Sequence, residues 1–236
     1  MTTIRDCIAP DRNPKVPSIK LPEGSIDTHV HIFESQYPLF EGRGYNPPDS
    51  TLDDLKYLHS QLGVSRVVYT QPSPYGVDNS AILKGMKVMN DETPGRARGV
   101  CAIKMDVSDD FLEDLDKQGI KGVRLNMDNI GGMPIGLDEI PTLEARIKDL
   151  GWHVEYLFPG KDIVELAPIF KKSSVPISIA HFAYQPATNG INSEGFKTLL
   201  DLVRDGNTWI KISGANRVSE TDLPPYDDVM PMARAL

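Results

Sequence analysis

Seven segments rich in β-branched residues alternate with helix-like segments, and this alternation restricts the fold more than any other feature. We expect strands at residues 25–32, 64–69, 98–103, 119–126, 152–158, 175–180 and 208–212. We expect helices at residues 51–62, 78–92, 109–117, 138–150, 161–172 and 194–205, and one that begins near 227. Strand–helix alternation with short links predicts a parallel sheet. Units of about 30 residues favour a TIM-type (β/α)8 barrel over a doubly wound sheet. No glycine-rich dinucleotide or phosphate loop follows any of the strands.

The last of these units ends the sequence at Leu236. A closed barrel needs an eighth strand between its first and seventh strands. Without it, both edge strands would carry unpaired backbone groups, each costing about 1 kcal/mol or more where it is buried. We therefore expect an α/β barrel over residues 25–236 that is truncated after its seventh strand. An extended arm with four prolines at residues 1–24 precedes it.

The composition excludes several classes of partner. A net charge of −8 and a pI near 5.1 leave no basic stripe to neutralise phosphates, which argues against nucleic acid. Cys7 and Cys101 lie far apart without paired-cysteine metal spacing, which favours a reducing compartment. No apolar signal segment opens the sequence, and no apolar run approaches membrane-spanning length. We expect one cytoplasmic domain with no membrane partner.

The first expected strand carries two histidines two residues apart. Read with the two-residue period of a strand, Asp27, His29 and His31 point to one side of it. In a parallel barrel this polar side is the lumen, and the carboxyl end of the strand opens into the mouth. The two imidazoles can then present nitrogens to one metal ion, one substrate carbonyl or one water. Asp27, one step deeper, is expected to orient a histidine. The alternative is an ordinary surface or packing pair.

Further polar residues follow later strands. His181 ends the sixth expected strand, either as a third member of the histidine cluster or as a packing imidazole. Arg124 ends the fourth strand, where an arginine can grip a substrate carboxylate or pair with a carboxylate on a neighbouring strand. Ser73 lies in the second mouth loop. Arg217, just past the seventh strand, is expected to meet an anionic group or solvent.

Other features concern the surroundings of these residues. His153 and Glu155 share one face of the fifth strand, either in the lumen or in a buried polar layer, and Tyr156 should face the helices. His59, late in the first helix, is expected to be a solvated helix residue. The long loop at residues 33–50 leaves the mouth beside the two histidines and is a candidate lid.

Several short motifs occur together in an order typical of one protein family. They are IDTHVHIF at 26–33, QPSPYGVDN at 71–79, GVRLN at 122–126, GWHVE at 151–155, His181, and IKISGANRVS at 210–219. In these motifs the chain resembles the amidohydrolase superfamily, in the branch of 2-pyrone-4,6-dicarboxylate lactonase and sulfomuconolactone hydrolase. The resemblance runs from about residue 22 to the end. It implies a (β/α)8 barrel that hydrolyses the lactone of a small carboxylated molecule, typically in aromatic catabolism.

The resemblance also implies roles for individual residues. Polarisation of the lactone carbonyl is implied for His29, His31 and His181. In this branch the histidines are expected to act as hydrogen-bond donors to the developing oxyanion, with no metal cofactor. Binding of carboxylate or sulfonate groups is implied for Arg124, Arg217, Ser73 and Tyr45.

The sequence departs from the family pattern at several positions. A second arginine expected after Arg124 is absent from the loop at 127–133, which favours a substrate with one anionic group. The general base of the family is an aspartate at the end of an eighth strand, and the sequence ends before such a segment. Loss of a base costs about 10²- to 10⁴-fold in rate. Glu155 is the one carboxylate that we nominate as a replacement base, because the two-residue period of its strand places it in the lumen.

Three hypotheses follow. The first is a hydrolase that opens the lactone of a small anionic molecule without a cofactor. The second is a zinc-dependent amidohydrolase, or a decarboxylase of a small aromatic acid, in which the metal ligands are His29, His31 and His181. The third is a non-catalytic truncated barrel that binds a ligand without turning it over.

Overall fold

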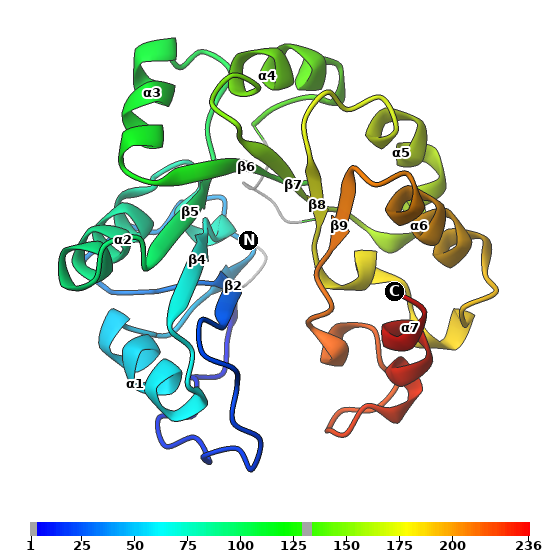
Figure 1. The fold of residues 1–236 in the computed structure, drawn as a ribbon, viewed down its shortest axis with the longest axis horizontal. Helices are drawn as coiled ribbons and strands as arrows, with labels where there is room; N and C mark the ends of the chain where they lie inside the picture. The colour runs from blue at the N-terminus through cyan, green and yellow to red at the C-terminus, as the bar shows by residue number, and fades with distance from the viewer. Residues whose placement is uncertain (1–3, 129–133) are drawn as a thin grey trace. The chain divides into compact units, whose positions relative to one another are not determined.

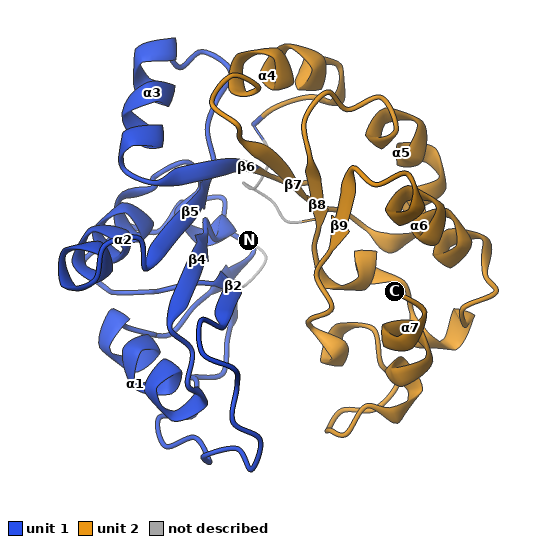
Figure 2. Cartoon of the chain, in the orientation of Figure 1, with its two compact units in different colours: residues 1–123, 129–134 blue, residues 124–128, 135–236 orange. Residues whose placement is uncertain are grey.

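The computed structural model describes residues 4–128 and 134–236 (Figure 1). These residues form two compact units (Figure 2). Unit 1 comprises residues 1–123 and 129–134, and unit 2 comprises residues 124–128 and 135–236. The described residues contain a seven-stranded sheet and a separate two-stranded sheet. The expected alternation of strands and helices is therefore confirmed, and the chain has an α/β fold.

Unit 1 contains the first four strands of the larger sheet in the order β2-β4-β5-β6. They are β2 (Ile26–Val30), β4 (Arg66–Thr70), β5 (Ala97–Cys101) and the start of β6 (Ile120–Asn126). All three pairings are parallel. The helices are α1 (Leu52–Leu62), η1 (Ser73–Tyr75), α2 (Ser80–Glu92) and α3 (Asp109–Lys117). Helices α1, α2 and α3 lie within a few residues of their predicted positions, whereas the turn η1 falls in a segment expected to be a loop.

Helix α2 packs closely against one face of these strands. The hydroxyl of Tyr69 on β4 contacts the sulfur of Met89 on α2 at 3.2 Å, and both residues are fully buried. A Cβ atom on Gly85 would come within 3.2 Å of both Tyr69 and Ile32, so glycine lets the helix approach the strands. Tyr69 and Ile32 therefore mark the helix-facing side of β4 and of the segment after β2.

The loop at residues 33–50 is fixed at several points. Phe33 and Ser50 form an antiparallel bridge that closes the base of the loop. The backbone N–H of Phe40 donates to the carbonyl of Pro74 at 2.7 Å. The N-terminal arm contributes β1 (Arg5–Asp6), which pairs in parallel with β3 (Tyr45–Asn46) within the loop. The arm therefore contacts the middle of the candidate lid.

Unit 2 contains the remaining strands, in the order β6-β7-β8-β9. After the end of β6 come β7 (His153–Leu157), β8 (Ile177–Ile179) and β9 (Thr208–Ile210). The pairings β7–β8 and β8–β9 are parallel. The longer helices are α4 (Ile140–Ile147), α5 (Ile163–Phe170), α6 (Glu194–Arg204) and α7 (Met230–Ala235). Short turns of 3-10 helix occupy Leu137–Glu139, Gly160–Asp162, His181–Tyr184, Ala187–Asn189, Ala215–Arg217 and Asp227–Val229.

The two faces of the unit 2 strands differ in character. Tyr156 on β7 lies 4.7 Å, ring centre to ring centre, from Phe170 on α5, so it faces the helices as predicted. Its neighbour Glu155 pairs in register with Ser178 on β8, which pairs with Trp209 on β9. These three residues share the opposite face, because register-paired residues of parallel strands point the same way. Polar side chains thus collect on the face away from α5.

The closed barrel, its truncation and the boundary at residue 25 stay predictions. Five residues of the predicted loop at 127–133, numbered 129–133, lie outside the described residues. Among the described helices, none has the length and apolar character needed to cross a membrane.

Thr51 should contribute measurably to the stability of α1. Its side chain accepts from the backbone N–H of Asp54 at 3.2 Å, and the Asp54 carboxylate accepts from the backbone N–H of Thr51 at 2.9 Å. Replacing an N-cap threonine by alanine costs about 1 kcal/mol. We expect Thr51→Ala to lower the free energy of unfolding by about that amount in urea denaturation, and Thr51→Ser to lower it far less. Equal stability of the two variants would contradict a capping role.

Candidate active site

Strand β2 contains a β-bulge that changes the predicted orientation of its side chains. Asp27 pairs with Val67 and Val30 pairs with Tyr69, so three steps along β2 match two steps along β4. Asp27 and Val30 therefore point to the same side, the helix-facing side marked by Tyr69. His29 and His31, which flank Val30, point to the opposite side. The prediction that Asp27 shares a face with the two histidines was wrong, because simple alternation does not hold across a bulge.

The histidine that Asp27 contacts through its side chain is His59. The Asp27 Oδ2 atom lies 3.2 Å from His59 Nε2. His59 is only 1% exposed, so the expectation of a solvated helix residue was also wrong. Its ring fills the contact between α1 and β2, where an apolar residue would usually lie. An imidazole is satisfied there because a carboxylate lies opposite it.

His29 and His31 form an edge-to-face pair with ring centres 5.0 Å apart. His31 Nδ1 lies 2.7 Å from the backbone carbonyl oxygen of Thr70 at the end of β4. A carbonyl oxygen only accepts hydrogen bonds, so Nδ1 carries a proton. Nε2 of the neutral ring then holds the lone pair. The structure thus fixes both the orientation and the tautomer of His31.

The other candidate residues of unit 1 lie at the end of β4, in the loop after it and in β3. The Thr70 hydroxyl is buried and has no hydrogen-bond partner within the described part of the chain. Gln71 donates to the carbonyls of Gly76 and Asp78 at 3.0 and 2.8 Å, which holds the loop after β4. Ser73 begins the 3-10 turn of this loop and is buried. Tyr45 lies in β3, half-buried beside the N-terminal arm.

Unit 2 places a buried carboxylate between two cations. Glu155 is fully buried, and its Oε2 accepts a hydrogen bond from Nζ of Lys211. Its Oε1 lies 3.7 Å from Nε of Arg124 on the adjacent strand β6. Of the two expectations for Arg124, the structure shows the ion pair with a neighbouring carboxylate. Its role towards a substrate stays a prediction.

His181 lies in a left-handed turn that the sequence does not predict. His181, Phe182, Ala183 and Tyr184 all have φ values between 49° and 54°. Left-handed helical backbone costs roughly 1–2 kcal/mol for each residue other than glycine. Phe182 and Ala183 are buried, and Gln185 donates from its side chain to the carbonyls of Ala183 and Gly160. Burial and these hydrogen bonds offset the backbone strain, which is typical of functional sites.

The environment of His181 keeps its ring neutral at pH 7. Burial lowers its pKa to about 4, and the nearby cations Arg217, Arg124 and Lys211 act in the same direction. Its Nδ1 lies 3.0 Å from the hydroxyl of Ser213. The ring stacks on Tyr184 with centres 5.9 Å apart. Arg217 donates to the Tyr184 hydroxyl at 3.1 Å and so belongs to the same group of side chains.

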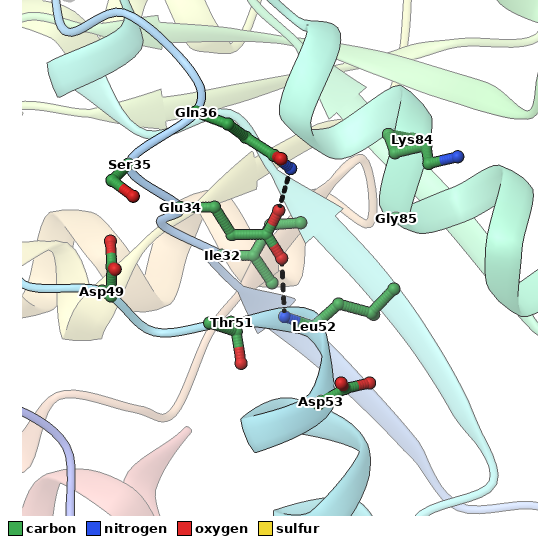
Figure 3. Close-up of a pocket in the computed structure, with 10 residues that line it drawn as sticks. All are labelled: Ile32, Glu34, Ser35, Gln36, Asp49, Thr51, Leu52, Asp53, Lys84 and Gly85. Atoms are coloured by element: carbon green, nitrogen blue, oxygen red, sulfur yellow. Dashed lines mark hydrogen bonds between the residues drawn. The ribbon is translucent and has the colours of Figure 1, made fainter.

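Two cavities in unit 1 involve the loop at residues 33–50. One, of about 440 Å³, lies by Ile32 and the first turn of α1, on the helix-facing side (Figure 3). Its Glu34 side chain accepts from the backbone N–H of Leu52 and from Gln36. The second, of about 430 Å³, is enclosed by the loop at residues 33–50 together with Tyr75. Neither is lined by His29 or His31.

A family model described as amidohydrolase (Amidohydro_2) matches residues 26–236. The chain belongs to the amidohydrolase family.

Curated relatives of this amidohydrolase carry the names of lactone-opening enzymes. It is 34% identical to a 2-pyrone-4,6-dicarboxylate hydrolase of Comamonas testosteroni, over 94% of this chain and 75% of the relative. It is 33% identical to a 4-sulfomuconolactone hydrolase of Hydrogenophaga intermedia, over 98% of this chain and 75% of the relative.

A solved structure is similar to this amidohydrolase as well. It is described as a probable 2-pyrone-4,6-dicarboxylic acid hydrolase from Acinetobacter baumannii with citric acid bound. It is 28% identical, with a TM-score of 0.76 over 90% of this chain and 77% of that one.

The structure of the amidohydrolase shows contacts of several residues that the sequence analysis did not predict. Lys211 was detectable, because strand parity places it on the same face as Trp209 and hence as Glu155. His59 carried no signal, since its partner lies 32 residues away in the chain. Gln71 bonds only five and seven residues ahead, but its partners are the backbone carbonyls of Gly76 and Asp78, which give no side-chain signal.

Gly160 should be essential for the left-handed turn of the amidohydrolase. A Cβ atom at this position would lie 2.0 Å from the carbonyl oxygen of Tyr184, well inside any real contact. We expect Gly160→Ala to lower the free energy of unfolding by about 2 kcal/mol or more, because the backbone must move. Gly44→Ala is the control, since a Cβ there meets nothing within 4 Å. Similar denaturation midpoints for the two variants would refute this packing argument.

The neutral His181 should make the amidohydrolase sensitive to acid. The unfolded imidazole takes up a proton near pH 6.5 and the folded one only near pH 4, so acid favours the unfolded state. The contribution is complete above about pH 6.5 and is lost as the pH falls towards 4. Urea denaturation between pH 7 and 4 in the presence of a chelator should show a smaller pH dependence in His181→Asn. Parallel curves for wild type and variant would exclude a perturbed His181.

Proposed function

We propose that this amidohydrolase adds water across the cyclic ester of a small carboxylated molecule, as in aromatic catabolism, and that it needs no metal. The observation that carries the proposal is the fixed pair His29–His31 at the carboxyl end of β2. It occurs in a chain that matches proteins named as lactone hydrolases over more than nine-tenths of its length. The (β/α)8 barrel is part of the proposal.

The histidines of unit 1 are proposed to polarise the lactone carbonyl. Negative charge develops on that oxygen as water attacks, and donors placed beside it lower the barrier. Since Nδ1 of His31 donates to Thr70, the ring donates from Nε2 only when both nitrogens are protonated. The proposal therefore assigns His31 an imidazolium form when the substrate is bound. The buried Thr70 hydroxyl supplies a further donor on this side.

The residues of unit 2 are proposed to attract the carboxylate of the substrate. Arg124, Lys211 and Arg217 all lower the pKa of His181, whereas Glu155 alone raises it. Three cations with one carboxylate leave an excess of positive charge around this histidine. Arg217 is exposed, and only one of its N–H groups donates to Tyr184. Its guanidinium is therefore available to an anion. Ser73 and Tyr45 are proposed to contribute as the family resemblance implies.

Glu155 is a poor candidate for the general base. Each of its carboxylate oxygens faces a cation, Oε2 towards Lys211 and Oε1 towards Arg124. A carboxylate in this position acts as a counter-ion, because removing it would leave two cations buried together. We assign Glu155 to charge balance rather than to proton transfer.

A metal-dependent amidohydrolase or decarboxylase is the second candidate. The observation in its favour is also His31, because a histidine that donates Nδ1–H to a carbonyl presents the Nε2 lone pair as a ligand. His29 and His31 would be two ligands of a divalent ion such as zinc. Among the described residues, no group of three His, Cys, Asp or Glu side chains is arranged to hold one. A bound ion would supply Lewis acidity to a carbonyl.

The test is hydrolysis of 2-pyrone-4,6-dicarboxylate, 4-sulfomuconolactone and a monocarboxylated lactone. We expect turnover that survives a chelator, with preference for the substrate that carries one anionic group. His31→Asn should lower kcat by about 10²-fold or more, as loss of an oxyanion donor does. Thr51→Ser serves as the control, since it lies in the cap of α1.

Two results would contradict the metal-free hydrolase. Stoichiometric zinc in the purified protein, together with loss of turnover on chelation, would establish the second candidate. Tight binding of a lactone acid with no turnover under either condition would establish a non-catalytic binding protein.

A further inference from the structure

The bulge in β2 contains a carboxylate, that of Asp27, which has no role in the proposed reaction. Asp27 reaches in two directions: Oδ2 lies 3.2 Å from His59 Nε2, and Oδ1 accepts from the backbone N–H of His29 at 3.2 Å. A bulge takes backbone groups of the longer strand out of the ladder. The Asp27 carboxylate therefore supplies a partner for the N–H of His29 at the position where the strand departs from regular pairing.

His59 in turn is held by the end of helix α1. Its backbone carbonyl accepts from the N–H groups of both Gly63 and Val64, where the helix stops and the chain turns towards β4. Gly63 has φ of 76°, the left-handed conformation of a helix C-terminus. Backbone and ring of His59 are thus both fixed, and the ring is almost completely buried. A carboxylate bound to such a ring has little freedom to move.

The position of this contact has a consequence for the paired histidines. The bulge lies between Asp27 and Val30 and so includes His29. Loss of the bulge would restore simple alternation, and His29 would then share a side with Asp27, towards α1. The pair His29–His31 exists on the opposite side because the extra residue is accommodated. Asp27 and His59 are the side chains positioned to stabilise it.

We infer that Asp27 and His59 are positioning residues, which hold His29 and His31 in register for the proposed reaction. They act through the backbone of the bulge and do not touch the substrate. The expected change in kcat rests on the proposed lactone hydrolysis. The expected change in the geometry of the bulge does not, and it can be measured separately.

The experiment compares His59→Leu, which removes the ring nitrogen, with His59→Gln, whose amide can still donate to Asp27. Asp27→Ala serves as a second disruption. Because Asp27 is only partly buried, this variant should lose less stability than His59→Leu. Asn90→Ala is the matched control. It removes two hydrogen bonds between α2 and Ala97, at the opposite end of the strands from Thr70.

The first readout is hydrogen exchange of the His29 backbone amide, with the ring ¹⁵N shifts of His29 and His31. We expect exchange at least about tenfold faster in His59→Leu and Asp27→Ala, with near wild-type values in His59→Gln and Asn90→Ala. The second readout is kinetic. The two disrupted variants should lose about 10- to 100-fold in kcat with KM within about twofold, and His59→Gln should recover most of it.

The outcomes separate the two proposals. If His59→Leu and Asp27→Ala lose stability like Asn90→Ala while His29 exchange and ring shifts stay unchanged, the positioning role is overturned. If the amide and ring signals change as expected but wild type turns over no lactone, the positioning role stands and the proposed function fails. If lactone turnover is normal in His59→Leu, the proposed function stands and the positioning role fails.

Discussion

One extra residue in strand β2 determines where the chemistry of unit 1 can occur. A parallel strand has a side that packs on helices and a side that does not, and each residue takes the side its register dictates. By inserting a step between Asp27 and Val30, the chain directs a carboxylate to α1 and two imidazoles away from it. The Thr70 carbonyl then fixes His31 at the strand end. Both hypotheses for this site, metal-free and metal-dependent, rely on that pair.

Unit 2 buries several charged side chains on one face of its strands. Glu155 is the counter-ion that makes Lys211 and Arg124 tolerable in the interior. Isolated buried cations would be far more costly. Burial, together with the same cations and Arg217, keeps His181 neutral. The proposed binding of an anionic substrate relies on this excess of positive charge beside His181.

The relation to lactone hydrolases gives these observations a common interpretation. Relatives named for dicarboxylate and sulfonate lactones match nearly the whole chain. An oxyanion needs donors, and an anionic substituent needs cations. Because Glu155 acts as a counter-ion, we do not assign it the role of general base in the proposed hydrolysis.

The sequence alone determined what depends on neighbours in the chain. Strand and helix positions followed from local periodicity. The N-caps Thr51, Ser108 and Ser193 are equally local, because each side chain accepts from the backbone N–H three residues ahead. Tyr156 was placed correctly because β7 is regular. Tertiary structure alone decided the side of Asp27, the burial of His59, the partner of Arg124 and the left-handed turn at His181. Each of these depends on a contact with a residue far away in the chain, and local pattern carries no information about such contacts.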